Sequence, residues 1–483
     1  MSVHQKDKEN LRRTKIVCTL GPAVATKDKI AQLVKAGMNV ARINCSHGSW
    51  ETRSQWIQWL KELRTEVAPV GILVDLQGPK FRIGELRDGE LNVEIGQVLT
   101  LGPNSGVDIP IMGPDILSAI AEHDRLLFGD GDVEVKIFSK IDNHIEAKAL
   151  SGGVIKTRQG LTLVGKSFDV SPLTEKDLYD VEQASKFDVD FIALSYVRSA
   201  ADMLELRRIV DQYNQGIQIC AKIETHEAVN HIDEIIKVSN VIMVARGDLG
   251  LQMDIEDVPI AQKKIISRCS LAAKPVITAT QMLESMIRSA RPTRAEATDV
   301  ANAILDGSDG VMLSAETASG NYPIEAVRVM SRIAEKTERI FNHSSHMAEL
   351  KRQSQGQVSS TEAVAMSAAQ LGSLVHAKAI VTTSTSGTTP RKVSKFRPSM
   401  PIFCASWNPK THTQMSMVWG VQAVHIPVPQ NTDQIVSSAV EVFSKKGLLH
   451  EDDMVVVTAG IPAGTPGHTN LIVVQTPSGL KSS

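Results

Sequence analysis

The feature that most constrains the fold is a short apolar run followed by an amphipathic segment, a unit that recurs along residues 15–340. Strands that alternate with helices pair in parallel, and eight such units close a (β/α)8 barrel. The eight predicted strands are Lys15–Leu20, Val40–Cys45, Gly71–Leu76, Phe191–Val197, Ile219–Glu224, Val241–Ala245, Pro275–Thr280 and Gly310–Ser314. The predicted helices between them include Thr26–Ala36, Ala200–Gln212 and Ile255–Ala273. We therefore expect an α/β protein built on a TIM barrel.

A segment of different texture interrupts the series between the third and fourth predicted strands. Residues 79–168 carry short β-like runs separated by glycine turns such as Gly129–Gly131. The runs are Leu91–Ile95, Val98–Leu101, Arg125–Phe128, Val133–Ile137 and His144–Ala149. We expect a small all-β domain. Because it leaves the barrel at the C-terminal end of a strand, where barrel enzymes carry their active sites, it is expected to act as a lid.

The rest of the chain predicts a long helix, a linker and a second α/β unit. The helix covers Tyr322–Ile340, the polar linker Asn342–Ser360, and a further helix Thr361–Val375. The predicted strands of the last unit are Ala379–Thr383, Pro401–Ala405, Val421–Ile426, Asp453–Thr458 and Asn470–Gln475. The expected domains are a discontinuous barrel (1–78 and 169–341), the lid (79–168) and a C-terminal regulatory domain (356–483).

Composition argues against several classes of protein. A net charge of -2 gives no general attraction to nucleic acid or to anionic membranes. No apolar run is long enough for a transmembrane helix, and Met1–Asn10 lacks the apolar core of a signal peptide. The cysteines form no C-x-x-C pair, which argues against a zinc cluster and a disulfide framework; they are Cys18, Cys45, Cys220, Cys269 and Cys404. We expect a cytoplasmic protein with reduced thiols.

Two carboxylates and a lysine are predicted to meet at the mouth of the barrel. Lys222 and Glu224 are two apart on the fifth strand and therefore share a face, and Asp248 follows the sixth strand. A carboxylate pair suits Mg²⁺, which keeps waters and substrate oxygens as its further ligands. The lysine could stabilise a phosphoryl group in transfer. The alternative is that Lys222 and Glu224 merely pair with each other at the barrel rim.

The second strand repeats this alternation with Arg42, Asn44 and Ser46, followed by His47. A guanidinium, an amide and a hydroxyl on one face favour an ion clamp, although a rim of satisfied polar groups is the alternative. Hydroxyls also end the seventh and eighth strands, at Thr280 and Ser314. They could relay a proton or bind a carboxylate, or they could only cap helices.

The run Arg291–Glu296 is expected to open a helix, with Pro292 in the first turn and Thr293 as its cap. Its arginines either face solvent or form a subunit contact beside the site.

The chain resembles the pyruvate kinase family in order from about residue 12 to 475, and seven segments carry the resemblance. They are RTKIVCTL (13–20), ARINCSHG (41–48), DLQGPKFRIG (75–84), AKIETHEAV (221–229), MVARGDLG (243–250), TATQMLESM (278–286) and RPTRAEATDVANAILDG (291–307). The resemblance implies transfer of phosphate from phosphoenolpyruvate to ADP, which gives pyruvate and ATP in the last step of glycolysis.

The resemblance also implies roles for individual residues. Glu224 and Asp248 would hold Mg²⁺ or Mn²⁺, Lys222 would stabilise the phosphoryl group, and Arg42 would grip the phosphate. The expected proton relay or carboxylate contact consists of Thr280 and Ser314. The positions of the family's monovalent-cation ligands are Asn44, Ser46, Asp75 and the carbonyl of Leu76. The other expected substrate and nucleotide contacts are Pro22, His47, Arg82, Asp130 and Gly247; the turn of Asp130 could also be a plain hairpin.

Lys80 departs from the family pattern, in which many members carry a glutamate at this position. Within the family, the glutamate accompanies dependence on K⁺ and a lysine accompanies independence from it. An ammonium group can supply the charge that K⁺ would otherwise bring, so we expect K⁺ not to be required. The alternative is a salt bridge between Lys80 and Asp75. Two milder departures, Cys45 and Ala315, remove no reacting group.

A hydroxyl-rich loop in the C-terminal unit is the expected effector site. Its residues are Thr383, Ser384, Thr385, Ser386, Gly387 and Thr388, and hydroxyls and amides at a helix start can hold phosphate. The alternative is a flexible connector. The resemblance implies a sugar-phosphate effector, with a second loop at Gly460–Gly467 closing over it. That loop contains no basic residue, which favours AMP or ribose 5-phosphate over fructose 1,6-bisphosphate.

Two other functions compete with this interpretation. A barrel lyase or aldolase acting on a 2-oxo acid would also hold Mg²⁺ with two carboxylates, but it would need no inserted lid. A catalytically inactive regulatory protein would not need Lys222, Glu224 and Asp248 together. The resemblance implies a homotetramer.

Overall fold

The computed structural model describes residues 12–479, apart from residues 104–105, 113, 167, 169, 355–357, 430 and 462–468. Eight parallel strands form a closed barrel in the spatial order β1-β16-β15-β14-β13-β12-β3-β2. Their bounds are β1 Lys15–Thr19, β2 Val40–Asn44, β3 Gly71–Asp75, β12 Phe191–Leu194, β13 Gln218–Ile223, β14 Val241–Ala245, β15 Val276–Ala279 and β16 Gly310–Leu313. All eight predicted barrel strands are confirmed, although most end earlier than expected.

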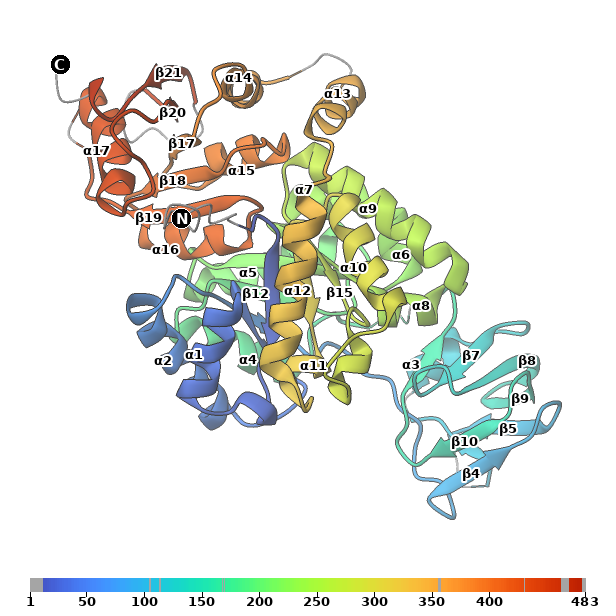
Figure 1. The fold of residues 1–483 in the computed structure, drawn as a ribbon. Helices are drawn as coiled ribbons and strands as arrows, with labels where there is room; N and C mark the ends of the chain where they lie inside the picture. Colours follow the sequence, from blue (N-terminus) through green and yellow to red (C-terminus); the bar gives the residue numbers. More distant parts are fainter. Residues whose placement is uncertain are drawn as a thin grey trace.

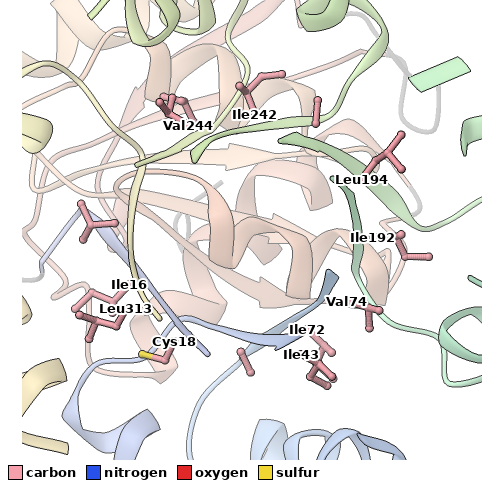
Figure 2. Close-up of a cluster of buried hydrophobic side chains, with 14 of the residues drawn as sticks. Ile16, Cys18, Ile43, Ile72, Val74, Ile192, Leu194, Ile242, Val244 and Leu313 are labelled. Atoms are coloured by element: carbon pink, nitrogen blue, oxygen red, sulfur yellow. The ribbon is translucent and has the colours of Figure 1, made fainter. Parts of the chain in front are cut away.

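Side chains alternate between the two faces of the barrel wall, as the two-residue period of a strand requires. On β1, Ile16 and Cys18 join the buried layer between the strands and the outer helices, whereas Val17 belongs to a separate cluster inside the barrel. Figure 2 shows side chains of the outer layer around the ring of strands. The inner cluster includes Phe191 and also Met417, which comes from the C-terminal unit.

The outer layer of the barrel is helical. The helices before and after the insert are α1 Lys27–Ala36, α2 Trp50–Glu66, α4 Glu175–Lys186, α5 Ala200–Tyr213, α6 His226–Asn230, α7 Ile232–Val238, α8 Arg246–Gln252, α9 Val258–Ala272, α10 Arg294–Leu305, α11 Ala315–Ala318 and α12 Pro323–Glu338. Short 3-10 turns occur at Pro22–Val24, Ile255–Asp257 and Glu284–Ile287. None of the helices in the described part of the chain combines the length and apolarity needed to span a bilayer.

The insert lies between β3 and β12 and forms its own sheets and core. A six-stranded sheet has the order β11-β7-β8-β9-β5-β6, and β10 pairs with β4. The bounds are β4 Glu90–Val93, β5 Val98–Gly102, β6 Ile109–Pro110, β7 Arg125–Phe128, β8 Val133–Ile141, β9 His144–Ala149, β10 Gly153–Lys156 and β11 Leu161–Leu163. The prediction of an all-β insert was incomplete, because it also contains a short helix, α3 (Pro114–Ala119).

The C-terminal unit has a five-stranded sheet in the order β19-β18-β17-β20-β21. Its strands are β17 Ala379–Thr383, β18 Ile402–Ser406, β19 Val421–His425, β20 Val455–Ala459 and β21 Leu471–Gln475, and its helices are α14 Ser360–Leu374, α15 Thr388–Lys395, α16 Pro409–Gln414 and α17 Thr432–Lys445, with a 3-10 turn at Met415–Met417. This unit and the insert lie on opposite sides of the barrel (Figure 1).

Two local predictions were wrong. The polar linker contains a helix, α13 (His343–Gln353), whose Leu350 reaches the core of the C-terminal unit. Pro292 precedes the first turn of α10 instead of lying in it, because Thr293 is the N-cap, as expected. The domain boundaries given above stay a prediction.

Candidate active site

Strand β13 and its end bring a lysine and a glutamate to the mouth of the barrel. Lys222 Nζ lies 2.8 Å from Glu224 Oε1 and 3.3 Å from Asp75 Oδ1, and it donates to Ser195 Oγ at 2.7 Å. Both Lys222 and Glu224 are less than 10% exposed. The predicted pairing of these two residues therefore occurs, but as part of a larger buried network.

Arg42 extends this network from β2. Its Nε and Nη2 both lie 2.6 Å from Asp75 Oδ2, at the end of β3, and its Nη1 donates to Thr19 Oγ1 at 3.0 Å. Two cations, Arg42 and Lys222, thus face two buried carboxylates, Asp75 and Glu224. Buried charges need such compensation because each loses its hydration.

Burial and neighbouring charges act in opposite directions on these groups. Burial disfavours the charge of Lys222, but Asp75 and Glu224 outweigh that effect and raise the pKa of Lys222. Burial would likewise raise the pKa of Asp75, but Lys222 and Arg42 hold it below its usual value. For Glu224 burial prevails over the attraction of Lys222, and its pKa is raised. Lys222 stays charged, so the site keeps a cation that can face an anionic ligand.

Asp248 lies in the first turn of α8, which follows β14 directly. It is exposed and lines the same cavity of about 430 Å³ as Glu224. This cavity lies between the barrel mouth and the insert, and it collects most of the predicted site. The predicted residues that line it are Arg42, Asn44, Ser46, Leu76, Lys80, Arg82, Asp130, Lys222, Glu224 and Asp248.

Lys80 reaches the cavity without forming the predicted alternative salt bridge. Asp75 pairs with Arg42 and Lys222 instead, and within the described residues Lys80 has no ion pair. Burial, followed by repulsion from Arg82, lowers the pKa of Lys80. Asp248 attracts the Lys80 ammonium group. Lys80 therefore contributes positive charge to the electrostatic potential of the cavity.

Three of the four predicted monovalent-cation ligands, Asn44, Asp75 and the Leu76 carbonyl, accept hydrogen bonds within the protein. Asn44 Oδ1 accepts from the Ser46 N–H at 3.0 Å, and the Leu76 carbonyl accepts from Ser195 Oγ at 2.7 Å. Asp75 is held by the two cations described above. These oxygens are therefore already engaged in polar contacts.

Thr280 and Ser314 lie beyond the ends of their strands and do not line the cavity. Thr280 has a φ of 68°, and its Oγ1 accepts from the Gly247 N–H at 2.8 Å, which places it beside Asp248. Ser314 Oγ is buried and has no hydrogen-bond partner among the described residues. An unpartnered buried hydroxyl is uncommon and often marks a functional position.

The remaining predicted nucleotide contacts are exposed at the rim. Pro22 and His47 lie outside the cavity lining. Arg82 and Asp130 line the cavity from the insert, and Arg82 Nη1 donates to the Arg158 carbonyl at 2.8 Å. The insert thus contributes both a cation and a carboxylate to the cavity.

Among the lining residues that were not predicted, Ser195 and Tyr196 contact the buried charges directly. Ser195 Oγ links Lys222 to the Leu76 carbonyl, and the Tyr196 N–H donates to Glu224 Oε2 at 2.7 Å. Both fell inside the predicted strand Phe191–Val197, but β12 ends at Leu194 because Tyr196 has a φ of 60°. The sequence did contain one indication of a functional position here, because the polar Ser195 directly follows the apolar run Phe191–Leu194.

The predicted effector loop connects β17 to α15. Ser384 Oγ accepts from the Gly387 N–H at 2.9 Å, the hydroxyls of Ser386 and Thr388 are 2.9 Å apart, and Arg391 Nη2 donates to the Ser386 carbonyl at 2.7 Å. Burial lowers the pKa of Arg391 to about 10. Most of the second predicted loop, its residues 462–467, lies outside the described residues.

Family comparisons match this architecture over nearly the whole chain. Residues 11–327 match the family described as pyruvate kinase, barrel domain, and residues 362–475 match the one described as pyruvate kinase, alpha/beta domain. The chain belongs to the pyruvate kinase family. It is accordingly a kinase, an enzyme of the transferase class, as the resemblance predicted.

Individual pyruvate kinases are similar over most of their length. The chain is 41% identical to a pyruvate kinase of Geobacillus stearothermophilus, over 97% of this chain and 81% of that protein. It is 42% identical to one of Agrobacterium vitis, over 95% and 97% of the two chains. A crystal structure of a pyruvate kinase from Cryptosporidium parvum superposes with a TM-score of 0.91 at 35% identity, covering 96% of both chains.

Proposed function

We propose that this pyruvate kinase transfers phosphate from phosphoenolpyruvate to ADP with a divalent metal held by Glu224 and Asp248. The observation that carries the proposal is the cavity in which these two carboxylates face Arg42, Lys80, Arg82 and Lys222. A site with both signs of charge suits a metal and two anionic substrates. The segment 79–168 is proposed to be the lid over it.

The two carboxylates fit a hard cation. Oxygen donors from one buried and one exposed residue leave room for the waters and substrate oxygens that Mg²⁺ or Mn²⁺ retains. When bound, the metal would polarise phosphoryl and carboxylate oxygens. Among the described residues no group of three or more His, Cys, Asp or Glu side chains is arranged to hold a metal.

The remaining roles follow from position. Lys222, kept charged by Asp75 and Glu224, would stabilise the negative charge of the phosphoryl group in transfer. Arg42 would bind the phosphate. Thr280 would orient the substrate carboxylate beside Asp248. Ser314, whose hydroxyl has no hydrogen-bond partner among the described residues, would move the proton that converts enolate to pyruvate.

The enzyme is also proposed to work without K⁺. The support is that one oxygen each of Asn44, Asp75 and Leu76 already accepts a hydrogen bond and that Lys80 brings a positive charge to the cavity. The test is the initial rate in tetramethylammonium buffer free of Na⁺ and K⁺. Added K⁺ should leave the rate unchanged, and activation of about tenfold or more, equivalent to 1.4 kcal/mol, would contradict the proposal.

Regulation is proposed to act through Thr383, Ser384, Thr385, Ser386, Gly387 and Thr388. The start of α15, where helix N–H groups can face an anion, and the nearby Arg391 support binding of one phosphate. Activation curves with AMP, ribose 5-phosphate and fructose 1,6-bisphosphate should favour the monophosphates. A selective response to the bisphosphate would refute this preference.

A coupled lactate dehydrogenase assay with phosphoenolpyruvate and ADP tests the central proposal. Formation of pyruvate that depends on ADP and on Mg²⁺ is expected. A lyase or aldolase would act on a 2-oxo acid without nucleotide, and an inactive regulatory protein would bind ligand without turnover. A cytoplasmic homotetramer is the proposed state of the enzyme, to be checked by fractionation of cells and by light scattering.

A further inference from the structure

The two connections of the insert meet one barrel side chain. Phe81 lies in the connection that enters the insert and Phe168 in the one that returns, and their ring centroids are 4.1 Å apart. The ring of Tyr196 lies 5.6 Å from that of Phe81, and Tyr196 Oη accepts from the Phe168 N–H at 3.3 Å. Because Phe168 belongs to the insert's own core, movement of the insert must displace the surroundings of Tyr196.

The backbone of Tyr196 also touches Glu224. Its N–H donates to Glu224 Oε2 at 2.7 Å, while Lys222 Nζ lies 2.8 Å from Oε1. With one donor on each oxygen, the orientation of the carboxylate depends on the peptide that ends at the Tyr196 nitrogen.

The backbone of Tyr196 itself has an uncommon conformation. A φ of 60° is rare for a bulky side chain, and such strain persists only where the surroundings impose it. The insert contributes the rings of Phe81 and Phe168 to the packing around Tyr196. All three aromatic residues line the cavity that contains Glu224 and Asp248.

We propose that Tyr196 is a positioning residue that couples the position of the insert to the orientation of Glu224. The divalent metal then binds most tightly when Phe81 and Phe168 pack against the Tyr196 ring. This inference rests on the proposed role of Glu224 as a metal ligand. Replacing a residue that orients a metal ligand changes metal affinity by roughly 10- to 100-fold.

The test measures binding of Mn²⁺ to the full-length protein without substrates, with free Mn²⁺ counted by electron paramagnetic resonance. Tyr196→Leu should raise the Kd by about tenfold or more. Phe81→Leu should raise it by about threefold or more, although Phe81 donates no hydrogen bond to Glu224. Tyr196→Phe keeps the ring and should weaken binding less than Tyr196→Leu. Phe138→Leu, at an exposed aromatic of β8 in the insert, is the matched control and should bind as the wild type does.

Glu224→Gln separates the two proposals. If this variant binds Mn²⁺ as tightly as the wild type, the metal site is wrongly assigned and the coupling falls with it. If Glu224→Gln loses the ion while Tyr196→Leu and Phe81→Leu retain wild-type affinity, the coupling alone is wrong. Circular dichroism checks folding, and Phe81→Leu decides the question if Tyr196→Leu does not fold.

Discussion

At the residue scale, the charges of the site balance before any ligand arrives. Arg42 and Lys222 offset Asp75 and Glu224 within the network. An incoming phosphate therefore needs additional positive charge. The proposed metal at Glu224 and Asp248 would supply it, together with Lys80 and Arg82 at the cavity wall.

Replacing Lys222 by methionine tests its contribution to phosphoryl transfer. Methionine keeps much of the apolar stem but removes the charge that would face the transferring group. The expected loss in kcat is about 10³-fold or more. Steady-state kinetics should be paired with Mn²⁺ binding, since retained binding shows an intact pair of carboxylates. A loss below about tenfold would exclude the role.

A substitution at Lys80 should make the enzyme depend on K⁺. Lys80→Glu replaces the proposed internal cation by a negative charge, so the variant should require an external cation. We expect K⁺ to activate it by about tenfold or more, equivalent to 1.4 kcal/mol, as initial rates in tetramethylammonium buffer will show. Lys80→Gln, which removes charge at similar size, is the control and should respond less. If K⁺ does not activate the Lys80→Glu variant, residue 80 does not determine whether the enzyme requires K⁺.

At the scale of elements, the (β/α)8 pattern could be predicted because period and turn chemistry agree along the strands. The helix α13 could not be predicted, because Met347 and Leu350 are its only large apolar side chains. The residues that it packs against are distant in the sequence. Within the candidate site, the proximity of Lys222 and Glu224 could be predicted because they are two residues apart on one strand. The contact between Tyr196 and Glu224 was not, because a single left-handed residue redirects the chain.

The start of α10 shows how a predicted cap connects two elements. Thr293 Oγ1 accepts from the Glu296 N–H at 3.2 Å, and Glu296 in turn accepts from the Ser285 N–H at 2.6 Å. Thr293→Ala should destabilise this end by about 1 kcal/mol, which corresponds to roughly fivefold faster hydrogen exchange in the first turn of α10. Thr293→Ser keeps the acceptor and should exchange as the wild type does. Equal exchange in the alanine variant would show that the cap contributes little.

At the scale of the whole molecule, the barrel separates the proposed catalytic and regulatory sites. The insert follows the C-terminal end of β3 and lines the cavity at the strand ends, whereas the C-terminal unit contacts residues near the N-terminal ends of the barrel strands. Met417 packs into the barrel interior, Gln218 donates to Gln414 at 2.9 Å, and Lys15 Nζ donates to the Val421 carbonyl at 2.7 Å. Within one chain, an effect of a ligand at Thr383–Thr388 on the cavity would pass through this junction.

We expect Lys15 to make the stability of the junction depend on pH. Burial, and secondarily repulsion from Arg12, lowers its pKa from 10.5 to about 7. Between these values the unfolded chain binds more protons than the folded one, so this residue's contribution to stability rises with pH. The stability of the wild type relative to Lys15→Met should therefore increase by on the order of 2 kcal/mol between about pH 7.5 and 9.5.

Unfolding curves of the two proteins, recorded in parallel across this range, check the sign, because all other titrating groups are common to both. The methionine variant should equal or exceed the wild type at neutral pH, where the wild type still carries part of the cost of a buried charge. A difference that stays constant with pH would mean that Lys15 keeps its proton throughout. The Val421 contact would then join the two domains as a permanent ammonium–carbonyl hydrogen bond.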